Sequence, residues 1–209
     1  MVRYWLFCSE NKGSIEMCIK RIGCWGTSDN PDAYKDLDIR SEDSFVLYCD
    51  KHFVGSGEIL SGPIMRKKNL HQLRGTRCRA CPSIVRVKFE KQFYKPLKDL
   101  ISGLSFLRDI NTNSRNFEKS VAASFRSKPR REIPEKDFKK IINASTTSYE
   151  CMIEGCTISD MRMIEEHHLR GGGRGPTTLL CANHHRLVTG NYIELQKTEN
   201  RKFRMKEKW

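Results

Sequence analysis

The feature that most constrains this chain is a concentration of cysteine and histidine near its C-terminus. Four of the six histidines and the last three of the nine cysteines lie between Cys151 and His185. Two short pairs, Cys151-x4-Cys156 and Cys181-x2-His184, lie about 25 residues apart, and each offers two ligands of the kind that hold tetrahedral zinc. A segment of about 60 residues has a small core, so a bound metal is expected to stabilise it. We therefore predict that these four side chains bind a structural Zn²⁺; the alternative is reduced, half-buried residues that bind nothing.

Three histidines remain after this assignment: His167, His168 and His185. Adjacent histidines are costly in a protein core because each needs a hydrogen-bond partner. A catalytic divalent cation explains them. One imidazole of the adjacent pair and His185 would hold the cation, and the other imidazole of the pair would deprotonate water. Neighbours on a regular strand point to opposite faces, so both can reach one phosphate only if the strand ends or bulges there.

The pattern C-x4-C … EEHHL … LLCANHH resembles the zinc-knuckle form of the HNH nucleases, a ββα-metal fold. The resemblance covers residues 147 to about 197. It implies that His168 is the general base and that His184 replaces the usual knuckle cysteine. The ligands it implies for a catalytic Mg²⁺, Mn²⁺ or similar ion are His167, His185 and Asn191.

The chain departs from this family at one point. Family members commonly carry Asn-Leu shortly before the second knuckle, where this sequence has PTTLLC. Either Thr177 or Thr178 takes over the orienting role of that Asn, or activity is reduced. Arg170 and Arg174 flank the glycines of GGGRG and are expected to bind DNA phosphates, with simple solvation of a loop as the alternative.

The charge of the whole chain indicates the class of its partner. A formal net charge of +13 over 209 residues favours a polyanion, either nucleic acid or an anionic membrane surface. The first residues, MVRYWLFCSE, contain too short an apolar run for a signal-peptide core or a membrane span. We therefore expect a cytoplasmic protein without a membrane partner, in which clustered cysteines bind metal rather than form disulfides.

Two domains are expected, with a boundary at STTSY, so that residues 1–143 and 144–209 fold separately. Alternating and apolar runs predict N-terminal strands over residues 3–9, 43–50, 52–61 and 83–93, with the second and third forming a hairpin. Helical spacing predicts helices over residues 15–26, 95–107 and 134–144. In the second domain, the pattern predicts a strand over residues 160–169 and a helix over residues 182–190.

The first domain resembles the EVE domain and its relative the YTH domain, both PUA-like folds. The segments that carry the resemblance are YWLFCSEN, CWGTSDN and SFVLYCD…HFVGSGEILSGP, within residues 2–143. The resemblance implies that a modified base, flipped out of the duplex, packs against aromatic walls. Extended to this chain, it makes Trp25 one wall and Phe53 a second, with Ser9 and Asn11 contacting the edge of the base.

Together these features predict an α+β chain with an N-terminal PUA-like EVE domain, a small mixed β-barrel with helices, and a C-terminal ββα-metal HNH domain. The combination resembles the EVE-HNH type IV restriction enzymes, which implies cleavage of DNA that carries 5-methyl- or 5-hydroxymethylcytosine. One ββα-metal unit cuts one strand, so a homodimer or transient pairing on DNA is expected. Two alternatives stay open. One is a reader of modified RNA or DNA with a purely structural zinc finger, and the other is an HNH nicking enzyme without modification dependence.

Overall fold

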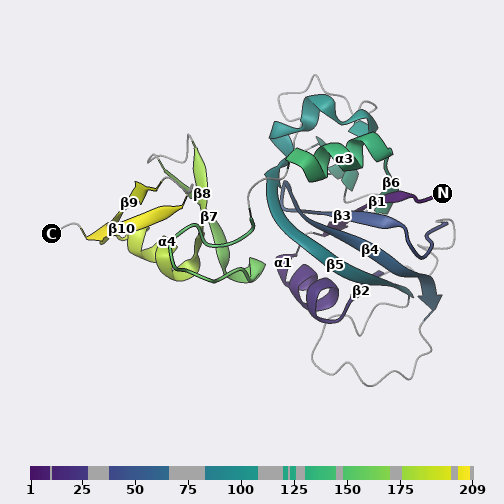
Figure 1. Cartoon of the computed structure of the whole chain (residues 1–209), viewed down its shortest axis with the longest axis horizontal. Helices are drawn as coiled ribbons and strands as arrows, with labels where there is room; N and C mark the ends of the chain where they lie inside the picture. The colour runs from purple at the N-terminus through teal and green to yellow at the C-terminus, as the bar shows by residue number, and fades with distance from the viewer. Residues whose placement is uncertain are drawn as a thin grey trace. The chain divides into compact units, whose positions relative to one another are not determined.

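The computed structural model divides the chain into two compact units, Met1–Ser148 and Tyr149–Trp209 (Figure 1). Each unit is described by itself. The residues described are 1–9, 11–27, 38–65, 83–107, 120–121, 123–125, 130–144, 148–169, 176–198 and 202–207.

The N-terminal unit is built on a six-stranded mixed sheet with the strand order β2-β5-β4-β3-β1-β6. β1 and β3 pair in parallel, and the other neighbours pair antiparallel. Figure 1 shows that the sheet curls strongly, with β2 and β6 as its two edges, so the described strands form the half-barrel of the predicted small mixed barrel. The strands are β1 (Tyr4–Ser9), β2 (Cys24–Thr27), β3 (Ser44–Cys49), β4 (His52–Met65), β5 (Ser83–Pro96) and β6 (Arg130–Glu132).

The predicted hairpin between the second and third strand segments is confirmed as β3 and β4. The two residues that join them, Asp50 and Lys51, both have positive φ values, 47° and 66°. Two-residue hairpin loops need this backbone because its twist matches the twist of the flanking strands. Asp tolerates the left-handed region well, whereas Lys at the second position adopts it at some cost.

Alternation along β1 places side chains on both faces of the sheet, and both faces are covered. Leu6 packs into a cluster with the segment after β5 and with helix α3 (Glu135–Ala144). Phe7 points to the opposite face, where its ring stacks on Trp25 at 5.6 Å and on Phe45 at 5.4 Å. β1 and β3 therefore form apolar runs, because both faces of these two strands are covered.

The helix predicted over residues 95–107 is wrong in type. The structure has three short 3-10 turns there, Leu97–Asp99, Ile101–Gly103 and Ser105–Leu107. Gly103 weakens a continuous α-helix, and the buried carboxylate of Asp137 on α3 accepts hydrogen bonds from the Ser105 hydroxyl and the Phe106 amide. The helical spacing nevertheless identified four side chains that are all buried: Leu97, Leu100, Leu104 and Leu107.

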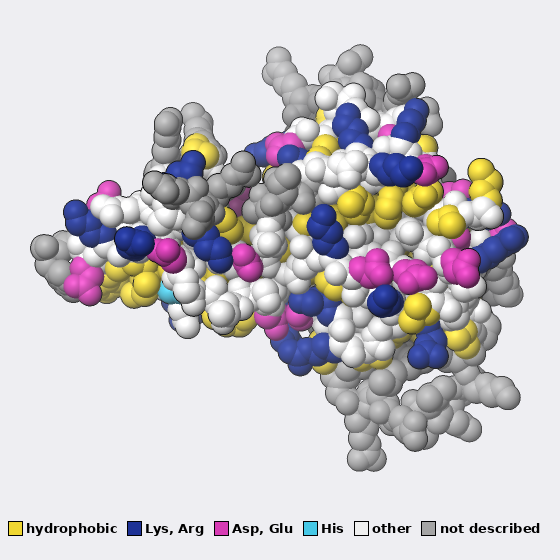
Figure 2. Space-filling view, in the orientation of Figure 1, with side chains coloured by type: hydrophobic (Ala, Val, Ile, Leu, Met, Phe, Trp, Pro, Cys, Tyr) yellow, Lys and Arg dark blue, Asp and Glu magenta, His cyan; other side chains and the backbone are white. Residues whose placement is uncertain are grey.

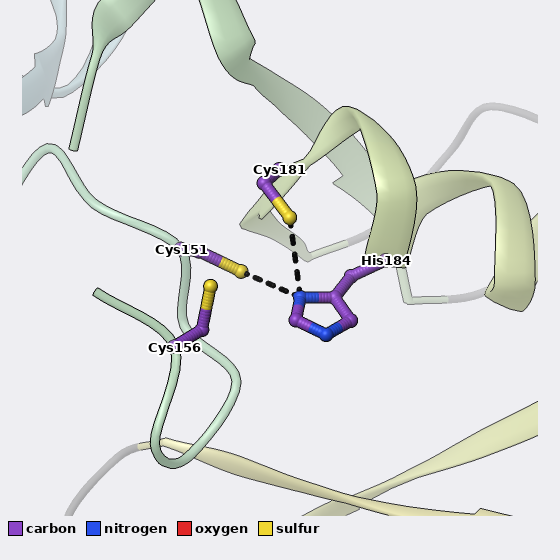
Figure 3. Close-up of side chains that lie close together, drawn as sticks. All are labelled: Cys151, Cys156, Cys181 and His184. Atoms are coloured by element: carbon purple, nitrogen blue, oxygen red, sulfur yellow. Dashed lines mark hydrogen bonds between the residues drawn. The ribbon is translucent and has the colours of Figure 1, made fainter. Parts of the chain in front are cut away.

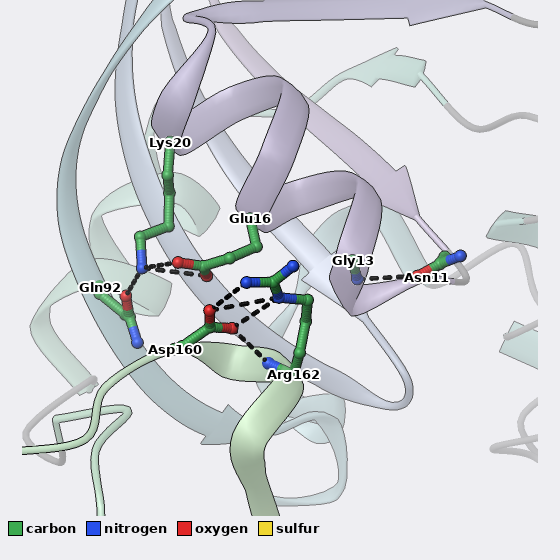
Figure 4. Close-up of polar contacts among 7 residues, drawn as sticks. All are labelled: Asn11, Gly13, Glu16, Lys20, Gln92, Asp160 and Arg162. Atoms are coloured by element: carbon green, nitrogen blue, oxygen red, sulfur yellow. Dashed lines mark hydrogen bonds and ion pairs between the residues drawn. The ribbon is translucent and has the colours of Figure 1, made fainter. Parts of the chain in front are cut away.

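A short helix, α1 (Lys12–Ser14), continues into a π-helix over Ile15–Arg21, which covers part of the predicted helix at 15–26. The side chain of Glu16, on this π-helix, is buried, with a relative exposure of 5%. The Lys20 ammonium donates to both Glu16 carboxylate oxygens at 2.7 and 3.0 Å, and to the Gln92 side-chain oxygen on β5 at 2.7 Å (Figure 4). Because the charge of Glu16 is paired, its burial is tolerated, and the same contacts tie the π-helix to β5.

The C-terminal unit has a ββα core followed by a hairpin. A 3-10 turn (Met161–Met163), capped by the Asp160 side chain, leads into β7 (Figure 4). β7 pairs antiparallel with β8, and α4 follows β8 directly. The β9–β10 hairpin then bridges back to Ile153 through Phe203. The elements are β7 (Ile164–His168), β8 (Thr177–Cys181), α4 (Ala182–Thr189), β9 (Ile193–Lys197) and β10 (Phe203–Glu207).

Three further observations bear on the predictions. No helix within the described ranges is long and apolar enough to cross a membrane. Cys18 is buried and disulfide-bonded. Figure 2 shows Lys and Arg side chains interspersed with Asp and Glu side chains over the face in view.

Candidate metal centre

The two predicted ligand pairs come together in the C-terminal unit. The ligand atoms of Cys151, Cys156, Cys181 and His184 all lie within 4.8 Å of one another (Figure 3). The Nδ1 atom of His184 lies 3.2 Å from the sulfur of Cys151 and 3.2 Å from the sulfur of Cys181. Among the described residues this is the one group of three or more such side chains close enough to share a metal ion.

Local backbone geometry explains the spacing within each pair. The loop after Cys151 turns back at Gly155, whose φ of +79° suits glycine, and the Cys156 amide donates to the Ile153 carbonyl at 3.1 Å. Cys181 is the last residue of β8 and the N-cap of α4, so the side chain three residues later lies within the first helical turn. The x4 spacing closes a loop, and the x2 spacing spans a strand end and a helix start.

The arrangement fits a tetrahedral ion such as Zn²⁺. With Zn–S bonds of about 2.3 Å and Zn–N bonds of about 2.0 Å, the edges of the ligand tetrahedron are about 3.5–3.8 Å long. The observed separations fall close to this range, so small shifts would admit the ion. Burial raises the pKa of the Cys151 thiol to about 12 and lowers the pKa of His184. A buried thiol of this kind becomes a thiolate only beside a strong positive charge, which a divalent cation supplies.

The two adjacent histidines of α4, His184 and His185, are placed differently. His184 turns into the cysteine cluster, whereas His185 lies beside His167 of β7, with 5.2 Å between ring centroids and 76° between ring planes. The Nδ1 atom of His185 lies 2.7 Å from a carboxylate oxygen of Glu165. The pKa of His167 is lowered, mainly by burial and to a smaller extent by the neighbouring His185 and His168. A lowered pKa favours the neutral imidazole, which is the form that binds metals.

His168 is exposed and is the last residue of β7. The β7–β8 register is regular, with His167 opposite Thr178 and His168 opposite Thr177. Residues that face each other across an antiparallel pair share a face of the sheet, so each threonine lies beside one histidine. Of the two conditions under which both histidines could serve one phosphate, a strand end or a bulge, the structure has the strand end.

Asn191 follows α4 in the left-handed backbone region, with φ of 62°, and its amide donates to the Val188 carbonyl. Asn is favoured in this conformation after a helix, which gives the residue a structural reason independent of metal. Its role as a third ligand stays a prediction. Arg170 and Arg174, predicted to contact phosphate, lie outside the described residues.

The residues predicted to read a base lie in the N-terminal unit. Ser9 ends β1, and its hydroxyl is hydrogen-bonded to the backbone of Asn11 in both directions at 3.1 Å. The exposed Asn11 caps α1 by accepting from the Gly13 amide (Figure 4). Trp25 is only 7% exposed and lies flat against Phe7. Ser9 and Asn11 are thus adjacent at the end of β1, and Trp25 has one ring face already covered.

Phe53 has no exposed surface and packs edge-on against Tyr48 in the core of the N-terminal unit. In this structure it offers no free ring face to a base. The pattern of apolar residues in β4 could not distinguish a core ring from a pocket ring.

Glu165 was not singled out from the sequence, although it contacts His185. Period-2 alternation gives the signal that could have found it, since Glu165 and His167 must share a face of β7. The next residue, Glu166, lies on the other face of β7 and is opposite Leu179 of β8.

The sequence matches no protein-family model and no curated protein. Several solved structures are similar to it, and three of them are complexes with modified nucleotides or with DNA that contains one. The YTH domain of Zygosaccharomyces rouxii MRB1 in complex with N6-methyladenosine RNA is 17% identical, with 68% of this chain and 86% of that chain covered and a TM-score of 0.45. Human THYN1 in complex with 5-methylcytosine DNA is 16% identical, with 70% and 99% covered and a TM-score of 0.45. The Pho92 YTH domain in complex with m6A is 17% identical, with 70% and 84% covered and a TM-score of 0.47. The solved structures that this chain resembles therefore include modified-nucleotide complexes, and those ligands belong to those proteins.

Proposed function

We propose that the chain is a modification-dependent DNA endonuclease, in which a zinc-stabilised C-terminal unit hydrolyses phosphodiesters and the N-terminal unit binds a modified base. The observation that carries the nuclease part is the division of the adjacent histidines on α4. His184 turns toward the cysteine cluster, and His185 faces His167. A purely structural zinc site needs the first contact and gives no reason for the second.

The catalytic chemistry follows from residues on β7 and α4. His167 and His185 would hold a divalent cation. Its positive charge would stabilise the negative charge that develops on the phosphate and on the leaving oxygen. His168, exposed at the end of β7, would take a proton from the attacking water at its imidazole nitrogen. Thr177, opposite His168 in the register, would help to orient that imidazole.

The choice of substrate rests on charge and on the sequence resemblance. A net charge of +13 favours DNA as a polyanion. The edge contacts would come from Ser9 and Asn11 at the end of β1, and Trp25 would supply the aromatic wall. For Trp25 to act as a wall, its surroundings must open, because little of its surface is exposed in the structure. A modified cytosine, either 5-methyl or 5-hydroxymethyl, is the proposed base, and paired copies on DNA would cut both strands.

A second candidate function is a reader of modified RNA or DNA whose zinc unit is only structural. One observation favours it: among the described residues, only the Cys₃His set brings three or more His, Cys, Asp or Glu side chains within sharing distance. A second cation would therefore have no more than two such side chains already that close together.

A cleavage assay separates these functions. Otherwise identical duplexes carrying cytosine, 5-methylcytosine or 5-hydroxymethylcytosine would be incubated with zinc-loaded protein and Mg²⁺ or Mn²⁺. The proposal expects cutting of modified DNA only, with loss of about 100-fold or more in the His168→Ala variant because a general base is removed. Glu194→Ala, an exposed glutamate on β9 outside the proposed machinery, serves as the matched control.

Each other outcome has a definite meaning. Cutting of all three duplexes would keep the nuclease and refute the base reader. Selective binding with no cutting in either metal would refute the nuclease and favour the reader with a structural zinc unit.

A further inference from the structure

The carboxylate of Glu165 and the imidazole of His185 form a contact between two elements of the C-terminal unit. The Glu165 Oε2 atom lies 2.7 Å from the His185 Nδ1 atom, within ion-pair distance. The side chain of His185 is 25% exposed and that of Glu165 is 50% exposed. The contact therefore lies at the surface, where a cation or phosphate can approach.

The position of Glu165 follows from strand geometry. Glu165 and His167 are two residues apart on β7, so their side chains leave the same face of the sheet. The same face meets His185 of α4, as both the carboxylate contact and the facing His167 ring show. Glu165 thus belongs to the same cluster as the two proposed cation ligands, although it contacts only one of them through its polar atoms.

We propose that Glu165 is a positioning residue that holds His185 with its proton on Nδ1 and leaves Nε2 free to bind the cation. The Glu165 carboxylate can only accept, and it faces Nδ1 at 2.7 Å, so the proposal places the proton on Nδ1. The neutral imidazole then has its lone pair on Nε2. Metal-binding histidines commonly donate their other ring nitrogen to such a carboxylate, which fixes the ring and makes it a stronger ligand. This inference rests on the proposed function, since it assigns a role in the same cation site.

The structure provides a matched control. Glu166 is the next residue on β7 and leaves the opposite face of the sheet, so it cannot contact His185 in the same way. Both glutamates are exposed and carry the same charge, so replacing either one changes the net charge of the unit equally.

The first experiment measures the tautomer directly and does not depend on activity. The full chain, labelled with ¹⁵N in histidine and loaded with zinc, would be studied by NMR at about pH 8, above the ordinary His pKa of about 6.5. The His185→Ala variant identifies the His185 signals. In the wild type we expect the proton on Nδ1. Glu165→Ala is expected to move it to Nε2, while Glu165→Gln keeps it on Nδ1 because the amide oxygen still accepts. Glu166→Ala should change nothing.

The second experiment measures Mn²⁺ affinity by calorimetry on the zinc-loaded protein. Glu165→Ala is expected to weaken binding by about 10- to 100-fold, the usual effect of losing a carboxylate behind a metal-bound histidine. Glu165→Gln should restore most of the affinity. A Gln variant as weak as the Ala variant would make Glu165 a direct ligand and overturn the positioning role.

Two results distinguish this inference from the proposed function. If His185 carries its proton on Nε2 in the wild type, or has the same tautomer after Glu165→Ala, the role of Glu165 is refuted whatever the activity. If the wild type binds no Mn²⁺ while the proton lies on Nδ1 as expected, the proposed function fails and the Glu165 contact stands.

Discussion

Loss of one zinc ligand is expected to unfold the C-terminal unit and to leave the N-terminal unit folded. The Cys181→Ala substitution removes a buried ligand from the Cys₃His set. Structural zinc contributes about 10–16 kcal/mol in small zinc domains, which is as large as the whole net stability of a typical domain, about 5–15 kcal/mol. The unit from Tyr149 to Trp209 holds 61 residues, too few for a large core. Nearly a third of the chain should therefore unfold.

The assay is an amide ¹H–¹⁵N spectrum of the full chain, recorded before and after substitution or zinc chelation. Resonances of the C-terminal unit should collapse to random-coil positions, and those of the six-stranded sheet should keep their dispersion. Cys49→Ala is the matched control, because Cys49 is also buried and outside any disulfide but lies on β3, away from the metal cluster. If Cys181→Ala binds no zinc yet keeps all dispersed resonances, the metal is not what holds the unit together.

Two predictions concern the N-terminal unit and are measured by thermal unfolding. The buried carboxylate of Asp43 accepts hydrogen bonds from the Trp5 indole at 2.9 Å and from two backbone amides at 3.0 Å, so Asp43→Ala should destabilise the protein by about 3 kcal/mol or more through unsatisfied donors. A Tm within a degree or so of wild type would contradict that role. A Cβ atom at Gly57 would lie 2.0 Å from the Lys88 carbonyl oxygen, so Gly57→Ala should force β4 and β5 apart at a cost of about 1–3 kcal/mol. An unchanged midpoint would show that the strands separate there without strain.

Most of the N-terminal strands could be predicted, because β1 and β3 are covered on both faces and form apolar runs, while β5 alternates buried and exposed residues. The segment before β6 and the strand itself could not, since Arg130–Glu132 is short and polar and becomes a strand only by pairing with β1. The helix predicted over residues 95–107 shows a different limit. Its leucine spacing is satisfied equally by an α-helix and by successive 3-10 turns, and the choice depends on Asp137, more than 30 residues later in the chain.

The candidate site divides in the same way. Ligands that sit within one turn or one strand end, such as Cys181 and His184, are readable from spacing because local geometry fixes their separation. Alternation along β7 places Glu165 on the face of His167, but its contact with His185 arises from the packing of α4 on β7, which the alternation alone does not reveal. The base-reading residues were hardest, since Phe53 and a pocket-lining aromatic residue have the same sequence pattern, and only burial separates them.

The most direct test of the central claim is to locate the ions by anomalous diffraction from crystals of the zinc-loaded chain grown with Mn²⁺. The account predicts a zinc peak among Cys151, Cys156, Cys181 and His184, and a separate manganese peak between His167 and His185. A zinc peak without any manganese at these histidines, in crystals where their side chains are ordered and accessible, would contradict the claim that the adjacent histidines of α4 serve two metal centres.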